Sequence, residues 1–140
     1  MIVNNKNIQV WLVFAQEDAK ISQVAWKAKI YSAVCFHTQQ QAEKLIKALI
    51  VSQTKKPAPK IHDLKTLIKK IKPSPPKNIT TAASYLSQFY LPTRYPDIIA
   101  GTIEQGLPNK IHAQKSLIAS KKINKYILNK LQSLTKFQKI

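Results

Sequence analysis

The chain has 140 residues, of which 44% are hydrophobic, and this length is sufficient for one domain with its own apolar core. Only two glycines occur, which argues against hairpin-rich folds and glycine-rich phosphate loops, and the single cysteine, Cys35, excludes a disulfide within the chain. The formal net charge of +17 favours polyanionic ligands, whose binding would weaken strongly with added salt.

Apolar residues recur at helical spacing through most of the chain, and prolines separate the segments. Pro57 follows the second segment, Pro73 the third and Pro92 the fourth. Asp63 stands directly before the short third segment and is expected to cap that helix. We expect helices over about residues 8–29, 31–52, 64–71, 78–91 and 110–137. The predicted fold is all-α, an antiparallel up-and-down helical bundle of four main helices plus one short helix, in a single domain over residues 1–140.

Several classes of protein are not favoured by the sequence. No apolar run approaches the roughly 20 residues that cross a bilayer, and the N-terminus becomes polar at once, so we expect a soluble, cytoplasmic protein without membrane contact. His37, His62 and His112 are too scattered to predict a zinc site, and no metal or other cofactor is expected. The apolar neighbours of Cys35 predict a packed thiol rather than a reactive one.

The chain carries 22 lysines but one arginine, Arg94, within a segment over residues 91–109 that holds three prolines and both glycines. A planar guanidinium is suited to bidentate recognition of phosphate or carboxylate, so we expect Arg94 and Tyr95 at an anion site. Pro96 and Asp97 are expected to form a structural turn. Arg94 could instead tie this connection down through a salt bridge to Asp97, or combine both roles with only its outer edge at the anion site.

A row of polar side chains follows one line of the second expected helix, at relative positions i, i+3, i+4, i+7 and i+10. Amides, an imidazole and two ammoniums can together hold a nucleotide or a phosphodiester, although many amphipathic helices simply present such a face to water. The row consists of His37, Gln40, Gln41, Lys44 and Lys47.

Four separate pieces of the sequence, in this order and spacing, resemble the HEPN domain family of prokaryotes, small helical bundles often found beside minimal nucleotidyltransferases. The resemblance is strongest over residues 8–97. The pieces are Trp11 with residues 15–18, residues 36–49, residues 62–64 with Leu67, and Tyr90 with residues 94–97.

This resemblance implies a bundle that is frequently a homodimer, in which the second helix and the region around the arginine contribute to one cleft. Many family members are toxin components or nucleotide-binding partners of a small nucleotidyltransferase, and some are ribonucleases. The ribonucleases carry an arginine followed after four to six residues by a histidine. In this chain that window after Arg94 holds Ile99, Ala100 and Gly101 instead.

The missing histidine matters because cleavage of RNA through its own 2′-hydroxyl needs a base, an acid and a cation for the phosphorane charge. Arg94 could supply the cation but carries protons poorly. His37 or His62 would have to reach the site across a dimer, and Tyr95 or Asp97 could assist. The sequence therefore leans against an enzyme, with Arg94, His37 and His62 as the catalytic candidates if activity exists.

Three functional hypotheses follow. The first is a nucleotide- or RNA-binding protein that acts with a separate small nucleotidyltransferase in a toxin–antitoxin-like pair. The second is a metal-independent endoribonuclease toxin, and the third is a non-catalytic basic module that binds an acidic protein. The sequence does not identify the base preference, the protein partner or the dimer geometry.

Overall fold

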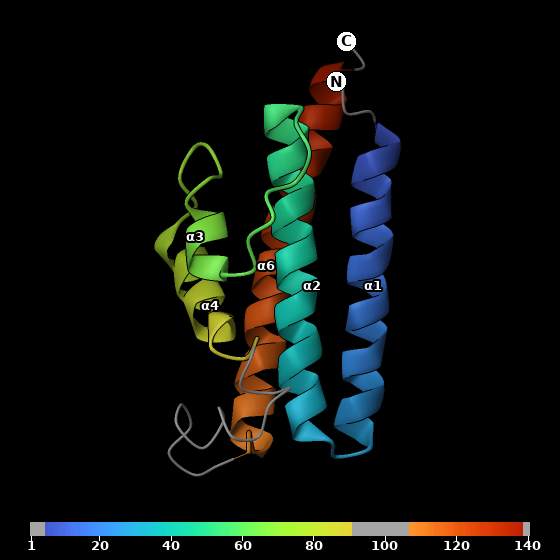
Figure 1. Ribbon diagram of the computed structural model, residues 1–140, viewed down its shortest axis with the longest axis vertical. Coiled ribbons are helices and arrows are strands. Elements are labelled where there is room, and N and C mark those ends of the chain that lie inside the picture. Colours follow the sequence, from blue (N-terminus) through green and yellow to red (C-terminus); the bar gives the residue numbers. More distant parts are fainter. Residues whose placement is uncertain (1–4, 91–106, 139–140) are drawn as a thin grey trace.

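The computed structural model describes residues 5–90 and 107–138. These residues contain five helices and no strand, which confirms the predicted all-α class. The helices are α1 (Asn5–Lys27), α2 (Tyr31–Thr54), α3 (Leu64–Ile68), α4 (Lys77–Ser87) and α6 (Lys110–Gln138). α1 and α4 run in one direction and α2 and α6 in the other, so the up-and-down bundle of four main helices plus one short helix is also confirmed (Figure 1).

α2 is the central helix of the bundle. It packs against α1, α3, α4 and α6, while α1 lies at the outer edge and makes its main contacts with α2 (Figure 1). The core between these helices is built mainly from aliphatic side chains. Its largest fully buried side chains include Leu45, Ile46, Leu49, Leu64, Leu67, Ile71, Leu86, Phe89, Ile123 and Ile127. None of the helices in the two described ranges is long and apolar enough to cross a membrane.

α1 and α2 are each followed by a lysine in the left-handed backbone region. Lys29, in the turn before α2, has φ 61°, and Lys55 at its C-terminal cap has φ 59°. The backbone N–H of Lys55 donates to the carbonyl of Val51 at 2.9 Å, which satisfies one of the last carbonyls of the helix. Glycine usually occupies such positions because it has no Cβ. With two glycines in the sequence, lysine takes this role here.

α3 and α4 are shorter than the apolar spacing predicts. α3 ends at Ile68, three residues before Ile71, yet Ile71 is only 1% exposed. α4 ends at Ser87, although Phe89 is fully buried beyond it. The apolar spacing therefore identified Ile71 and Phe89 as buried but overestimated the lengths of α3 and α4. An apolar side chain can reach the core from a turn as well as from a helix.

Asp63 caps α3 as predicted. Its carboxylate accepts hydrogen bonds from the backbone N–H groups of Lys65 and Thr66, at 3.4 and 3.3 Å, and from the hydroxyl of Thr66 at 2.7 Å. The hydroxyl of Ser87 at the end of α4 also donates to this carboxylate, at 2.6 Å. The bonds from Ser87 and Thr66 lower the pKa of Asp63 from its ordinary value of 3.8. The cap thus also holds α3 against α4.

Replacing Asp63 with alanine is expected to lower the free energy of unfolding by about 1 kcal/mol at neutral pH, the usual effect of a lost N-terminal cap. Because the pKa of Asp63 is lower in the folded than in the unfolded chain, this contribution is present above the ordinary carboxyl pKa. It is lost as the pH falls through the lower folded-state value. Urea unfolding of both proteins across this acidic range measures the difference. A difference in unfolding free energy between the two proteins that stays constant as the pH falls through this range would contradict a contribution from the ionised Asp63 cap.

Cys35 is fully buried, and its predicted structural character is confirmed. The hydroxyl of Ser116 on α6 lies 3.5 Å from its Sγ. Burial raises the pKa of the Cys35 thiol to about 11, although the Ser116 bond opposes this. The thiolate, which is the reactive form, is therefore scarce at neutral pH.

Candidate functional site

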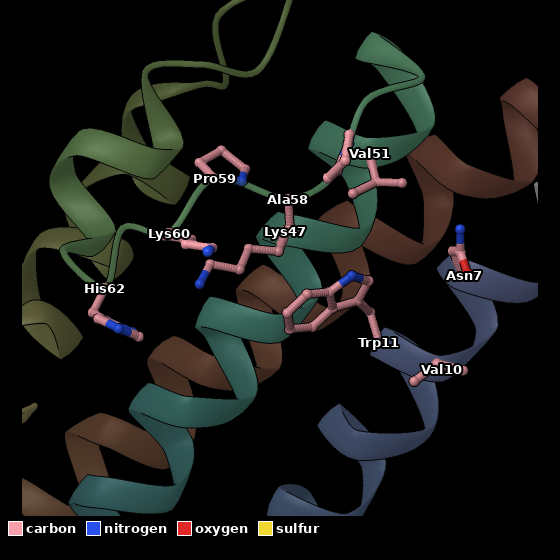
Figure 2. A pocket seen from close by; sticks show the side chains of 10 residues that line it. Asn7, Val10, Trp11, Lys47, Val51, Ala58, Pro59, Lys60 and His62 are labelled. Carbon is pink, nitrogen blue, oxygen red and sulfur yellow. The ribbon is translucent and has the colours of Figure 1, made fainter. Parts of the chain in front are cut away.

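A hollow of about 640 Å³ opens between the first half of α1, the second half of α2 and the connection from α2 to α3 (Figure 2). Most of its wall is apolar, and its cationic groups come from α2 and from the connection. We call it the Trp11 hollow. It is lined by Asn7, Val10, Trp11, Lys47, Val51, Pro57, Ala58, Pro59, Lys60 and His62.

The local sequence explains why these groups meet. Lys47 and Val51 are four residues apart on α2 and therefore lie on one face, opposite Trp11 of α1. Pro57 and Pro59 keep the following connection out of helical conformation, so that it runs back along α2. That return path carries His62 to the same hollow (Figure 2).

Glu43 is the centre of a buried polar cluster beside this hollow. Its side chain is 7% exposed and accepts hydrogen bonds from Lys47 Nζ at 3.0 Å and from His62 Nδ1 at 2.9 Å. Gln39 Nε2 lies 3.5 Å from the other carboxylate oxygen and 3.4 Å from the carbonyl of His62. We call Gln39, Glu43, Lys47 and His62 the Glu43 cluster. It fastens the connection after α2 onto the face of α2.

Lys47 presents its ammonium at the wall of the Trp11 hollow. The side chain is 5% exposed, and Nζ lies 5.6 Å from the centroid of the Trp11 ring, within the range of a cation–π interaction. An ammonium has three N–H donors, and the hydrogen bond to Glu43 uses one of them. Lys47 can therefore donate to a ligand without leaving Glu43.

His62 is held in one orientation at the same place. A carboxylate only accepts hydrogen bonds, so Nδ1 of His62 carries the proton that is donated to Glu43. The imidazole also stacks on the Tyr90 ring, with centroids 5.0 Å apart and planes 10° apart. Its side chain is 53% exposed. In the neutral ring Nε2 is consequently an acceptor for a ligand proton.

A second cluster, also built on one buried carboxylate, joins α1 to α2. Asp18 of α1, 5% exposed, accepts from His37 Nδ1 at 2.9 Å and from Lys44 Nζ. We call Asp18, His37 and Lys44 the Asp18 cluster. In both clusters one buried carboxylate holds one histidine and one lysine, and both lysines belong to α2.

The five polar residues predicted as one row on α2 do not share one surface. Gln41 is buried and lines grooves between α1 and α6, whereas Lys47 lines the Trp11 hollow. Gln40 Nε2 donates to the Gln39 side chain at 2.7 Å. His37 and Lys44 belong to the Asp18 cluster. The row is divided because α2 is the central helix, and neighbouring helices cover several of its sides.

The other predicted site residues, Arg94, Tyr95, Pro96 and Asp97, lie outside the described residues. The expected meeting of Arg94 with the α2 row therefore stays a prediction. Within the described ranges, no three His, Cys, Asp or Glu side chains are grouped closely enough to hold a metal ion.

Sequence reasoning did not predict that Asp18 and Glu43 organise these clusters. A signal for Asp18 was available, because it falls on the stripe of α1 that holds Trp11, Ala15 and Ser22, and an acid among buried positions needs a partner. Lys60 was also missed, since nothing in its neighbourhood in the sequence distinguishes it from the other lysines. Its position follows from the return of the chain after Pro57 and Pro59.

Comparisons with known proteins agree with this architecture. The HEPN domain family model matches residues 8–136. The fold is similar to the crystal structure of TT1696 from Thermus thermophilus, with a TM-score of 0.76 and 24% identity over 88% of this chain and 97% of that chain. It is also similar to ST0689, an archaeal HEPN homologue, with a TM-score of 0.69 and 25% identity over 88% of this chain and 96% of that chain. A comparison with curated proteins finds no match.

Proposed function

The chain belongs to the HEPN domain family, and on this premise we propose that it binds a nucleotide or the end of an RNA strand in the Trp11 hollow. The observation that carries the proposal is the presence of an indole ring and ammonium groups at one hollow. Aromatic rings accept stacked bases with little preference for sequence, and ammoniums pair with phosphates. The volume of about 640 Å³ is within the usual range for a small-molecule site.

The charge at the hollow supports an anionic ligand. Glu43 offsets the charge of Lys47, but Lys60 is exposed and forms no ion pair within the described residues. The neighbouring connection adds Lys55 and Lys56, both exposed. With a net charge of +17 on the chain, a nucleotide approaches through a positive field that raises its rate of capture.

Filling the hollow tests the proposal directly. Ala58 lines the hollow and is partly exposed, so Ala58→Trp places a large side chain where the ligand would lie. Calorimetric titration with ATP, GTP and short RNAs is expected to show affinity weakened by about tenfold or more, which corresponds to about 1.4 kcal/mol. The matched control is Ala28→Trp, at an exposed position that lines none of the described pockets. Equal nucleotide affinity in the two variants would refute binding in this hollow.

The proposal includes a homodimer. Support comes from a second apolar stripe on α1, beside its buried face, whose members are between 44% and 67% exposed: Val10, Val13, Phe14, Ile21 and Val24. A helix whose apolar surface extends well beyond its buried face usually packs against a further partner. Lysine is absent between Asn7 and Ala19, so two copies can approach at this stripe with less repulsion than elsewhere on so basic a chain. Light scattering measures the mass, and a monomer at high concentration would refute the dimer.

The proposal also includes a protein partner, a small nucleotidyltransferase in a toxin–antitoxin-like pair. Its support is the family membership. Affinity purification of the chain from its own cells is expected to recover this enzyme in stoichiometric amount. Recovery of the chain with nucleic acid alone would contradict the partnership.

One observation favours ribonuclease activity as a second candidate function. His62 lines the Trp11 hollow with its Nδ1 held by Glu43, an arrangement seen in general bases, and Lys47 and Lys60 line the same hollow. His62 would take the 2′-hydroxyl proton, and the 2′-oxygen would attack phosphorus as the bond from phosphorus to the 5′-oxygen breaks. One ammonium would stabilise the phosphorane charge and the other would protonate the leaving 5′-oxygen. Cleavage of a fluorogenic RNA in EDTA, with loss of activity in His62→Gln, is the expected result. An inactive wild-type preparation would exclude this activity.

A further inference from the structure

A second cavity, a groove of about 580 Å³, runs between α4 and α6 on another part of the bundle. The two helices pack side by side (Figure 1). We call it the α4–α6 groove. It is lined by Lys77, Asn78, Thr81, Ala82, Tyr85, Lys115, Ile118, Ala119 and Lys122.

The groove carries three positive charges that no carboxylate offsets within the described residues. Lys77, Lys115 and Lys122 are all exposed, and none takes part in an ion pair there. The sequences of α4 and α6 contain no Asp or Glu. Lys44 and Lys47 of α2, by contrast, are each held by a buried acid. The α4–α6 groove is therefore a stronger attractor of anions than the surface above the two buried clusters.

The spacing of the lysines along the groove matches the spacing of phosphates along a nucleic acid strand. Lys115 and Lys122 are seven residues apart on one side of α6, a separation of about 10.5 Å along the helix axis. This distance is about the rise of three stacked nucleotides. Lys77 lies on the opposite wall, where α4 begins without a side-chain cap, so the positive end of the helix dipole adds to its charge.

The floor of the groove is suited to the sugars and bases of such a strand. Ala82 and Ala119 are each 6% exposed, and their small side chains leave room between the helices. Ile118, 52% exposed, and Tyr85 provide apolar surface at the sides. Inorganic polyphosphate has no apolar groups that could contact this surface, whereas the sugars and bases of a nucleic acid strand can contact it.

We propose that the α4–α6 groove binds the phosphodiester backbone of single-stranded RNA. The inference deepens the proposed function and rests on it for the kind of ligand: the Trp11 hollow takes a nucleotide or strand end, and the groove takes a stretch of backbone. Binding at the groove should be insensitive to base sequence, because its charged contacts are with phosphates.

Fluorescence anisotropy with a labelled single-stranded oligouridylate tests the groove. The triple variant Lys77→Gln, Lys115→Gln, Lys122→Gln removes three ammoniums and keeps side chains that favour helix. Each lost phosphate contact lowers the slope of log affinity against log salt by about 0.7, so the slope is expected to fall by about 2. If the affinities converge near about 1 M salt, the variant binds about 100-fold more weakly at about 0.1 M.

The control is a second triple variant, Lys65→Gln, Lys69→Gln, Lys70→Gln, which changes the net charge equally at exposed positions outside the groove and outside the Trp11 hollow. Its RNA affinity and salt slope are expected to change far less than those of the groove variant. Equal losses in the two triple variants would overturn the proposal, since net charge alone would then explain RNA binding. Circular dichroism of all proteins verifies that they are folded.

The same titrations distinguish failure of the groove from failure of the hollow. ATP binding by the groove variant is expected to match that of wild type. If ATP binds and Ala58→Trp weakens its binding as expected, but the groove variant binds RNA like wild type, only the groove inference is wrong. If ATP does not bind and the groove variant still loses RNA affinity about 100-fold, the groove is supported and the proposed role of the hollow is wrong.

Discussion

Glu43→Ala is expected to lower the free energy of unfolding by about 3 to 5 kcal/mol, the usual loss when one member of a buried ion pair is removed. The physical reason is the position of Lys47. Its side chain is 5% exposed, so little water can replace the carboxylate at its ammonium once Glu43 is gone. The His62 and Gln39 side chains lose the carboxylate as an acceptor at the same time, and the connection after α2 loses its His62–Glu43 bond to α2.

Asp18→Ala provides the matched comparison, because it removes the carboxylate of the other cluster. Lys44 and His37 are 24% and 25% exposed and can turn towards solvent when Asp18 is lost. We expect this variant to lose about 1 to 2 kcal/mol. Urea unfolding of both variants at neutral pH measures the two losses. A cost of Glu43→Ala no greater than that of Asp18→Ala would show that Lys47 finds water or another partner.

The helices of this protein were predictable because their determinants are local. Apolar spacing defined the long helices to within a few residues, and prolines at positions 57, 73 and 76 mark where helices cannot continue or can begin. Asp63 was recognised as a cap from its place before Leu64 and Leu67. These features depend on neighbours within a few positions in the sequence, so one sequence is sufficient to read them.

The candidate site was less predictable because its contacts join distant positions. Asp18 bonds Lys44 across 26 residues, and Glu43 bonds His62 across 19. Which lysine of α2 meets which acid depends on the rotation and shift of the packed helices, and the α2 sequence does not determine these. Lys47 illustrates the result: it was predicted within a polar row, and it lies buried between Glu43 and Trp11.

The Asp18 cluster and the Glu43 cluster contribute differently to stability and to ligand binding. The Asp18 cluster joins α1 to α2, and both of its cations are partly exposed. The Glu43 cluster joins α2 to the connection that supplies Lys60 and His62 to the Trp11 hollow, and its lysine is buried at the hollow wall. Packed apolar residues can often replace a buried ion pair without loss of stability. We therefore expect the Glu43–Lys47 pair to serve ligand binding rather than stability.

The double variant Glu43→Leu, Lys47→Met is the sharpest test of that argument. Both replacements approximate the volume of the original side chains, and methionine keeps an unbranched stem beside Trp11. Replacing a buried ion pair by packed apolar residues is often neutral or stabilising, so the double variant is expected to recover most of the roughly 3 to 5 kcal/mol lost in Glu43→Ala.

Nucleotide binding by the same double variant is expected to respond in the opposite way. The Trp11 hollow keeps its apolar wall but loses the Lys47 ammonium and the Glu43 bond that orients His62, so affinity for ATP should fall by about tenfold or more, at least the effect of one charge-assisted hydrogen bond. Urea unfolding and calorimetric titration on one preparation measure both quantities. A stable double variant with wild-type ATP affinity would remove Lys47 from the binding site, whereas stability regained with binding lost would identify the buried pair as a device for recognition.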